Sequence, residues 1–281
     1  MKVLRKICRF LPIKFVLYID NFRAYGKVLN LKNPQYYAEK IQWIKLYGKA
    51  ERFTLFVDKY LVRSYVEEKI GNDYLPKLYK TYKEINEINY DELPERFVLK
   101  LNNGSGGNVI CRDKSILDRD LTNEKFSKLI KEKYYKYTKE PQYKNVKTII
   151  ICEEYIEDSK GQLIEYSLHC FNGNVKFIEV HTDRFNGYKE NYYYPDWTET
   201  EFRGKLKSKA DYIEKPKNLE KLIELGESLA QGFVYVRVDF NDVDNKLYFS
   251  ELTFTPSSGT EGLYPLKYDL EIAEMIDVKK Y

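Results

Sequence analysis

The stretch that decides the fold is 235-YVRVDFNDVDNKLYFSELTFTPSSG-259. Its β-branched and aromatic residues predict two strands, YVRVDF and LYFSELTF, joined by the turn-forming residues 241–245. Alternation puts Arg237 with Asp239 on one face of the first strand and Glu251 with Thr253 on one face of the second. Strands this apolar are expected to be largely buried, so their carboxylates need a counter-charge.

Two interpretations of this acidic hairpin remain open from the residues alone. Asp239 and Glu251 side by side would offer oxygen ligands to a divalent cation such as Mg²⁺. Alternatively, Asp239 pairs with Arg237 or another basic residue. The two acids can face each other only if the connection holds an odd number of residues, for example 244–246, because a two-residue turn would place them on opposite faces.

Length and composition indicate a soluble protein of two lobes. The chain has 281 residues, 32% of them charged, and its mean hydropathy is −0.59. A net charge of +4 is too small to indicate nucleic-acid binding. The cysteines are dispersed without a CxxC pair, which is typical of a reduced, cytoplasmic protein: Cys8, Cys111, Cys152 and Cys170.

Basic residues interrupt the apolar ones of the N-terminal segment, so no clean hydrophobic segment of the signal-peptide or membrane-span type is expected: Lys2, Arg5, Lys6, Arg9 and Lys14. An amphipathic basic helix that touches anionic lipid is one interpretation. We favour packing of the apolar side chains against the rest of the fold: Leu4, Ile7, Cys8 and Leu11.

Hydrophobic spacing predicts helices over 36–47, 54–69, 122–137 and 219–229. Asp58, Lys59 and Arg63 would form an ordinary solvated face of the second helix. Residues 183–216 show little periodicity and are expected to form a long loop, either a lid or a partner surface.

The second informative stretch is 97-FVLKLNNGSGGNVIC-111, in which two apolar strands flank a glycine-rich hairpin. Successive N–H groups of such a loop can hold phosphate oxygens, and Lys100 lies on the incoming strand. It is neither a Walker A loop nor a Rossmann turn, because no Gly-Lys-Ser/Thr and no helix follows. Taken alone, it is also compatible with a flexible hairpin tip.

The strand predicted at 148–152 ends on two acids, Glu153 and Glu154. His169 and His181 have no second His or Cys at ligand spacing. We therefore expect both to be packed or hydrogen-bonded histidines, not zinc ligands.

These parts in this order resemble ATP-grasp enzymes: a strand lysine before a Gly-Ser-rich hairpin, a strand ending in paired acids, then Arg-x-Asp and Glu-x-Thr on the last hairpin. The chain is most similar to the TupA-like ATP-grasp amidoligases of bacterial surface-polysaccharide and teichuronopeptide gene clusters. The similarity rests on segments 29–45, 58–66, 97–107, 169–178 and 251–259.

The resemblance implies roles for individual residues. Arg63 and Lys100 would contact the nucleotide phosphates, and the lid would be formed by Gly104, Ser105, Gly106 and Gly107. Purine recognition would use the Glu153 side chain and the main chain of Glu154, Tyr155 and Ile156, and Glu165 would hold the ribose.

The last hairpin would hold the magnesium. Asp239 and Glu251 would be ligands, and Arg237 would stabilise the transferred phosphoryl group. Thr253 stands where ATP-grasp sites generally place Asn, which leaves open whether one or two Mg²⁺ ions bind. We expect the acceptor pocket to involve Ser257, Ser258, Gly259, Asp183 and Arg184, with Lys205 or Lys207.

The resemblance therefore implies an α+β ATP-grasp fold. Its parts would be a helical N-terminal region (1–50), an N-lobe with the lid (51–152) and a C-lobe with the metal-binding hairpin (153–281). ATP and Mg²⁺ would serve a cytoplasmic ligase that joins a sugar carboxylate to an amino acid or small amine through an acylphosphate, in capsular polysaccharide biosynthesis. The alternatives are an ATP-grasp small-molecule kinase and a non-catalytic or sugar-transferase protein. No nucleic-acid partner is expected, and at most a peripheral membrane contact through the N-terminal helix.

Overall fold

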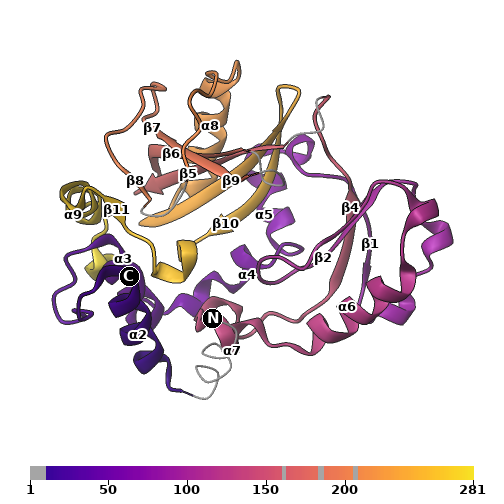
Figure 1. The fold of residues 1–281 in the computed structure, drawn as a ribbon, viewed down its shortest axis with the longest axis horizontal. Coiled ribbons are helices and arrows are strands. Elements are labelled where there is room, and N and C mark those ends of the chain that lie inside the picture. Colours follow the sequence, from indigo (N-terminus) through magenta and orange to yellow (C-terminus); the bar gives the residue numbers. More distant parts are fainter. Residues whose placement is uncertain (1–10, 160–162, 183–186, 205–207) are drawn as a thin grey trace.

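The computed structural model describes residues 11–281 apart from 160–162, 183–186 and 205–207. Figure 1 shows two antiparallel sheets, one on the right and one at the upper left, with helices α4 and α5 between them. This is the α+β architecture expected from the sequence.

The first sheet has the strand order β1-β4-β2-β3. Its strands are β1 (Leu78–Tyr82), β2 (Phe97–Leu101), β3 (Val109–Cys111) and β4 (Ile150–Glu154). One face packs on α6 (Arg119–Lys131), where Phe126 meets Phe97 and Leu99. Strand β4 runs to Glu154, and the expected lobe boundary at 152 stays a prediction.

The second sheet has the order β10-β9-β5-β6-β7. Its strands are β5 (Ile164–Phe171), β6 (Asn174–Thr182), β7 (Lys189–Tyr193), β9 (Tyr235–Val243) and β10 (Lys246–Thr253). One face is apolar and packs on α8 (Leu219–Ala230) through Leu222, Leu225 and Leu229. The opposite face carries the alternate residues of each strand, which are mostly polar.

Strand β7 corrects the expectation of a loop over 183–216. Its sequence KENYY has no apolar alternation, yet Tyr192 and Tyr193 are buried. A short two-stranded ribbon follows, made of β8 (Arg203–Gly204) and β11 (Leu263–Tyr264).

The helices of the N-terminal region pack beside the C-terminal helix. In α3 (Tyr37–Tyr47), Ile41 and Ile44 share one core with Ile272 and Ala273 of α9 (Leu266–Glu274). Helix α2 (Ile13–Tyr25) lies against α3 in turn. Leu4, Ile7 and Cys8, which were expected to pack on the fold, lie outside the described residues.

The helix expected over 54–69 is broken in two, α4 (Thr54–Val57) and α5 (Val62–Ile70). Asp58 has an extended backbone, and its carboxylate accepts hydrogen bonds from the N–H groups of Tyr60 (2.9 Å) and Leu61 (3.1 Å). Aspartate favours helix starts, and here its hydrogen bonds to main-chain N–H groups interrupt the expected helix.

The remaining segments are short. The helix expected over 122–137 is likewise two helices, α6 and α7 (Tyr134–Thr138), and Asp118 caps the first. Single 3₁₀ turns complete the chain: η1 (Ala50–Phe53), η2 (Asn72–Tyr74), η3 (Ile85–Glu87), η4 (Tyr90–Glu92), η5 (Lys114–Ile116), η6 (Pro141–Tyr143), η7 (Pro256–Gly259) and η8 (Val278–Lys280). Among the described residues, no helix has the length and apolar character needed to cross a bilayer.

Candidate active site

A cluster of cations surrounds one buried carboxylate at the end of the first sheet. Glu153 receives Lys100 Nζ at 2.5 Å and Arg63 Nη1 at 3.0 Å. Lys100 lies opposite Ile151, and Glu153 opposite Val98, so the pleat puts Lys100 and Glu153 on one face. A small cleft there is also lined by Lys59 and, from β10, by Phe249 and Ser250. The first sheet, α5 and the last hairpin therefore meet at this point.

Lys59 is the residue of this cleft that sequence reasoning missed. Its Nζ lies 2.7 Å from Glu251 Oε2 and donates to the carbonyl of Gly104 at 3.1 Å. The break in the helix at Asp58 turns the Lys59 side chain towards Glu251 and Gly104. In a continuous helix this side chain would have remained in solvent. The signal available in the sequence was Asp58, which interrupts the helix immediately before Lys59.

Asp239 and Glu251 do face each other, as the sequence predicts, but by a different route. The connection is a two-residue turn, Asp244 and Asn245, both with positive φ, which are 52° and 69°. A β-bulge at Ser250 then shifts the register by one residue and pairs Glu251 with Asp239. The expectation of a connection with an odd number of residues was therefore wrong. The bulge shifts the second strand by one residue, which returns Glu251 to the face of Asp239.

The ion-pair interpretation of the acidic hairpin describes the contacts in the structure, and the metal interpretation stays a prediction. Arg237 bonds both carboxylate oxygens of Asp239, Nε at 2.8 Å and Nη2 at 2.6 Å. Glu251 takes Lys59, and the Thr253 hydroxyl donates to its second oxygen at 2.9 Å. Two adjacent carboxylates and a hydroxyl form a ligand set that fits Mg²⁺. In this structure the side chains of Arg237 and Lys59 supply the positive charge beside these carboxylates.

Burial governs the electrostatics of these two acids. Burial raises the pKa of Asp239 even though Arg237 opposes it. Burial acts in the same direction on Glu251, but Lys59 and Arg237 outweigh it and lower its pKa to about 2. Glu251 is thus held ionised and ready to take a cation.

The glycine-rich hairpin is tied to α5 through Asn102. The Asn102 amide donates to Asp58 Oδ2 at 2.8 Å, and its carbonyl accepts the N–H of Lys59, also at 2.8 Å. Gly104 has a φ of 76°, and a Cβ there would lie 2.5 Å from the ring of Tyr134. Ser105 and Gly106 at the tip are exposed and Gly107 is half-buried.

Main chain leaves the first sheet just after the acids. Glu154 ends β4, and Tyr155 and Ile156 continue beyond it, beside Lys77, whose carbonyl accepts the Glu154 N–H at 2.8 Å. The Glu153 carboxylate is held by two cations, so its expected contact with adenine stays a prediction that the structure makes less favourable. The expected role of Glu165, a buried residue of β5, also remains a prediction.

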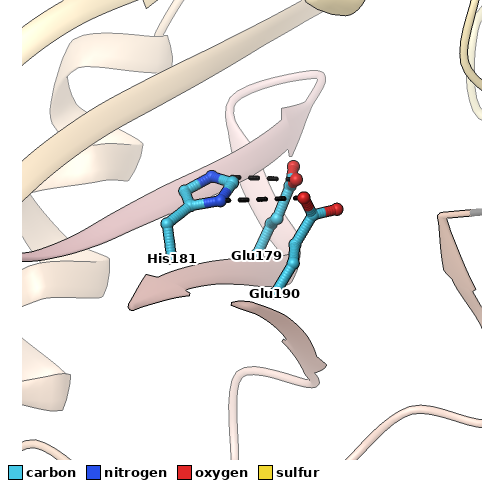
Figure 2. A group of neighbouring side chains, drawn as sticks. All are labelled: Glu179, His181 and Glu190. Atoms are coloured by element: carbon cyan, nitrogen blue, oxygen red, sulfur yellow. Dashed lines mark ion pairs between the residues drawn. The ribbon is translucent and has the colours of Figure 1, made fainter. Parts of the chain in front are cut away.

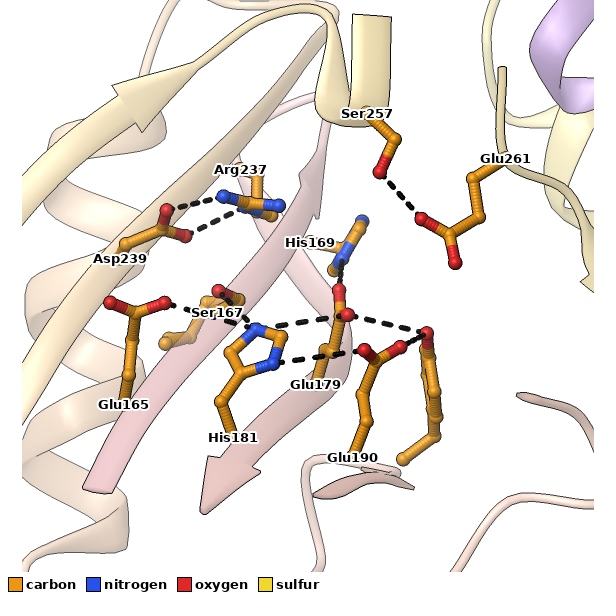
Figure 3. A network of polar contacts seen from close by, with 12 residues as sticks. Glu165, Ser167, His169, Glu179, His181, Glu190, Arg237, Asp239, Ser257 and Glu261 are labelled. Atoms are coloured by element: carbon orange, nitrogen blue, oxygen red, sulfur yellow. Dashed lines mark hydrogen bonds and ion pairs between the residues drawn. The ribbon is translucent and has the colours of Figure 1, made fainter. Parts of the chain in front are cut away.

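A buried hydrogen-bonded network continues from Asp239 across the polar face of the second sheet (Figure 3). Ser167 lies opposite both Asp239 and Glu179, and His169 opposite Arg237. Ser167 Oγ is 3.2 Å from His181 Nε2, and His169 Nε2 is 3.1 Å from Glu179. Burial favours the neutral form of Glu179, but His181 and His169 outweigh it and hold its pKa well below the ordinary value.

Glu179, His181 and Glu190 bring three potential ligand atoms within 4.8 Å of one another (Figure 2). Tyr188 bonds both His181 Nδ1 (2.5 Å) and Glu190 (3.1 Å), and Tyr192 bonds both glutamates. The two hydroxyls join His181 and both glutamates in one hydrogen-bonded network. Both histidines are hydrogen-bonded, as expected.

The loop after β10 is strained and clamped from the N-terminal region. Ser257 and Ser258 both have left-handed backbone, with φ of 47° and 55°. Gln42 Nε2 donates to the carbonyls of Ser258 (3.1 Å) and Gly259 (2.6 Å), and Lys45 Nζ to that of Ser258 at 2.9 Å. Such conformations cost roughly 1–3 kcal/mol each and persist only where the surroundings impose them. Four expected acceptor residues cannot be placed, because Asp183, Arg184, Lys205 and Lys207 lie outside the described residues.

A model of the TupA-like ATPgrasp family matches residues 39–277. The chain belongs to this family. No curated protein matches it. Among solved structures, D-alanine–D-alanine ligase from Bacillus anthracis in complex with ATP is 20% identical, with a TM-score of 0.40 over 71% of this chain and 54% of that one.

Two further solved structures are similar at the same low level. D-alanine–D-alanine ligase from Helicobacter pylori is 15% identical, with a TM-score of 0.44 over 81% of this chain and 61% of that one. Biotin carboxylase from Campylobacter jejuni is 15% identical, with a TM-score of 0.42 over 82% and 47%. The TupA-like chain thus spans 47–61% of the length of these three proteins. The family match, not these similarities, carries the assignment.

Proposed function

We propose that this TupA-like protein is an ATP-dependent ligase that joins a carboxylate to an amine and releases ADP and phosphate. The observation that carries the proposal is that Lys59, Arg63 and Lys100 line one cleft, and that Lys59 reaches from it to Glu251, which is paired with Asp239. Cations from the α4–α5 segment and from β2, beside paired carboxylates, are what a nucleotide triphosphate with Mg²⁺ requires.

Binding would begin with an exchange of partners. Lys59, Arg63 and Lys100 turn from Glu251 and Glu153 to the phosphates, and the 104–107 hairpin covers them. The main chain of residues 154–156 would contact the purine, and Glu165 the ribose. Asp239, Glu251 and Thr253 would hold Mg²⁺, which supplies charge neutralisation to the phosphates when bound.

The chemistry then follows from positioning. A carboxylate oxygen of the substrate attacks the γ-phosphorus, and the bond to the ADP oxygen breaks, which leaves an acylphosphate and ADP. The amine nitrogen adds to the acyl carbon, loses a proton and expels inorganic phosphate, so that an amide remains. Arg237 lies beside Asp239 and would stabilise the transferred phosphoryl group.

The substrates would lie beyond the nucleotide. We propose a sugar carboxylate and an amino acid or small amine, in bacterial surface-polysaccharide synthesis. The clamped loop Ser257–Gly259 would shape this pocket. A cavity lined by Glu190, Tyr192, Phe202 and Arg203 offers further room at the far end of the polar face.

The test is ADP formation from Mg-ATP with a panel of sugar carboxylates and amines, with products read by mass spectrometry. We expect a product lighter by one water than the sum of the two substrates, and a hydroxamate when hydroxylamine replaces the amine. Asp239→Asn should abolish both products while the protein stays folded. A phosphorylated product formed without amine would instead establish a kinase, and failure to bind Mg-ATP would establish a non-catalytic protein.

A further inference from the structure

Helix α2 is apolar on both of its faces. Val16 and Leu17 are buried, and Leu17 packs with Leu29 and Leu31. On the opposite side Phe15, Ile19 and Phe22 follow one another at the spacing of a single helical stripe. Phe15 is 65% exposed and Phe22 59% exposed. A helix that is apolar all round is normally covered on both faces.

The charges around this stripe are of one sign. Lys14 and Arg23 are exposed and flank it, one residue from Phe15 and Phe22 respectively, so that helical geometry puts them at the two edges of the stripe. Residues 1–34 contain eight basic residues and one acidic residue, Asp20, hence a net charge of +7. The whole chain carries +4, which leaves −3 for everything after residue 34. The positive charge of this protein is therefore concentrated in the segment of the sequence that contains the exposed aromatic stripe.

We propose that α2 docks on the surface of a membrane that contains anionic lipid. Phe15, Ile19 and Phe22 enter the boundary between headgroups and acyl chains, and Lys14 and Arg23 lie among the anionic headgroups. A second copy of this chain fits the face less well, because dimerisation would bring two strongly positive segments together. The inference is independent of the reaction that the protein catalyses.

The experiment is co-sedimentation of the full chain with phosphatidylcholine vesicles that contain about a third phosphatidylglycerol, against vesicles of phosphatidylcholine alone. The wild type should bind the anionic vesicles, and high salt should weaken the binding. The double variant Phe15→Ser/Phe22→Ser should bind at least about tenfold more weakly, because two aromatic anchors are lost.

A matched control removes two other exposed apolar side chains. Ile116 is 81% exposed and Leu121 62% exposed, both near α6 of the other lobe. Ile116→Ser/Leu121→Ser should bind like the wild type, and thermal melts check that both variants fold. Absence of wild-type binding, or equal binding by the Phe variant, would overturn the proposal. So would a dimer in sedimentation that the Phe variant dissociates, since the occupant would then be a second copy.

Discussion

Replacing Lys59 with Met should destabilise the protein without nucleotide and weaken ATP binding. The ion pair with Glu251 spans 2.7 Å, and the two side chains are 14% and 30% exposed. Together with Arg237 it lowers the pKa of Glu251 from 4.5 to about 2. That shift corresponds to an upper limit of about 3 kcal/mol, and partial exposure and the share of Arg237 reduce the Lys59 contribution to about 1–2 kcal/mol.

The sign of the pH dependence follows from the lowered pKa. Glu251 contributes its stability above about pH 4.5 and loses it as the pH falls towards 2, because the folded carboxylate must then take up a proton. The difference in unfolding free energy between wild type and Lys59→Met should therefore shrink over that range. At neutral pH the melting temperature should fall by about 2–4 °C.

The decisive measurement is a double-mutant cycle by thermal and urea unfolding. Glu251→Gln should remove most of the penalty of Lys59→Met, with a coupling energy of about 1–2 kcal/mol. Additive effects would refute the argument that the two side chains stabilise each other. Both single variants should bind ATP with Mg²⁺ at least about tenfold more weakly, as measured by calorimetry.

Two further predictions concern other buried charges. Glu153→Gln leaves Lys100 and Arg63 without their shared carboxylate and should cost about 1–3 kcal/mol in urea unfolding, with a matched Glu154→Gln change near zero. Burial lowers the pKa of Lys45 to about 8, so the folded state releases this proton before the unfolded state does. Between about pH 8 and 10.5 the wild type should therefore gain stability relative to Lys45→Met, and a constant difference across that range would contradict the assignment.

The two strands of the hairpin were predictable from their residue types, but the face-to-face placement of the two acids depends on a bulge. Asp239 and Glu251 lie on opposing strands. Alternation puts Asp239 on the same face as Arg237, and Glu251 on the same face as Thr253. What the sequence did not reveal is the bulge at Ser250. A bulge depends on the strand twist and on the packing of Phe249, and no residue type in the hairpin marks it.

Other misses have the same kind of cause. The break at Asp58 depends on a carboxylate that bonds main chain locally and reaches Asn102, 44 residues away, so that helical periodicity alone misplaces Lys59. Strand β7 was not predicted because its polar residues face the buried network, where Tyr188 and Tyr192 are hydrogen-bonded to Glu190. At Asp58 a long-range partner overrides the local pattern, and in β7 the pairing with β6 does so.

The ion pair between Lys59 and Glu251 also bears on the order in which ligands can bind. In the free protein the cations of the nucleotide site already contact carboxylates of the same chain, and Lys100 and Arg63 share that of Glu153. A phosphate that binds Lys59 leaves the Glu251 carboxylate without this cation. A cation that binds Glu251, in turn, leaves Lys59 free to bind a phosphate. Nucleotide and Mg²⁺ should thus promote each other's binding reciprocally, by the same factor, and each alone should bind weakly.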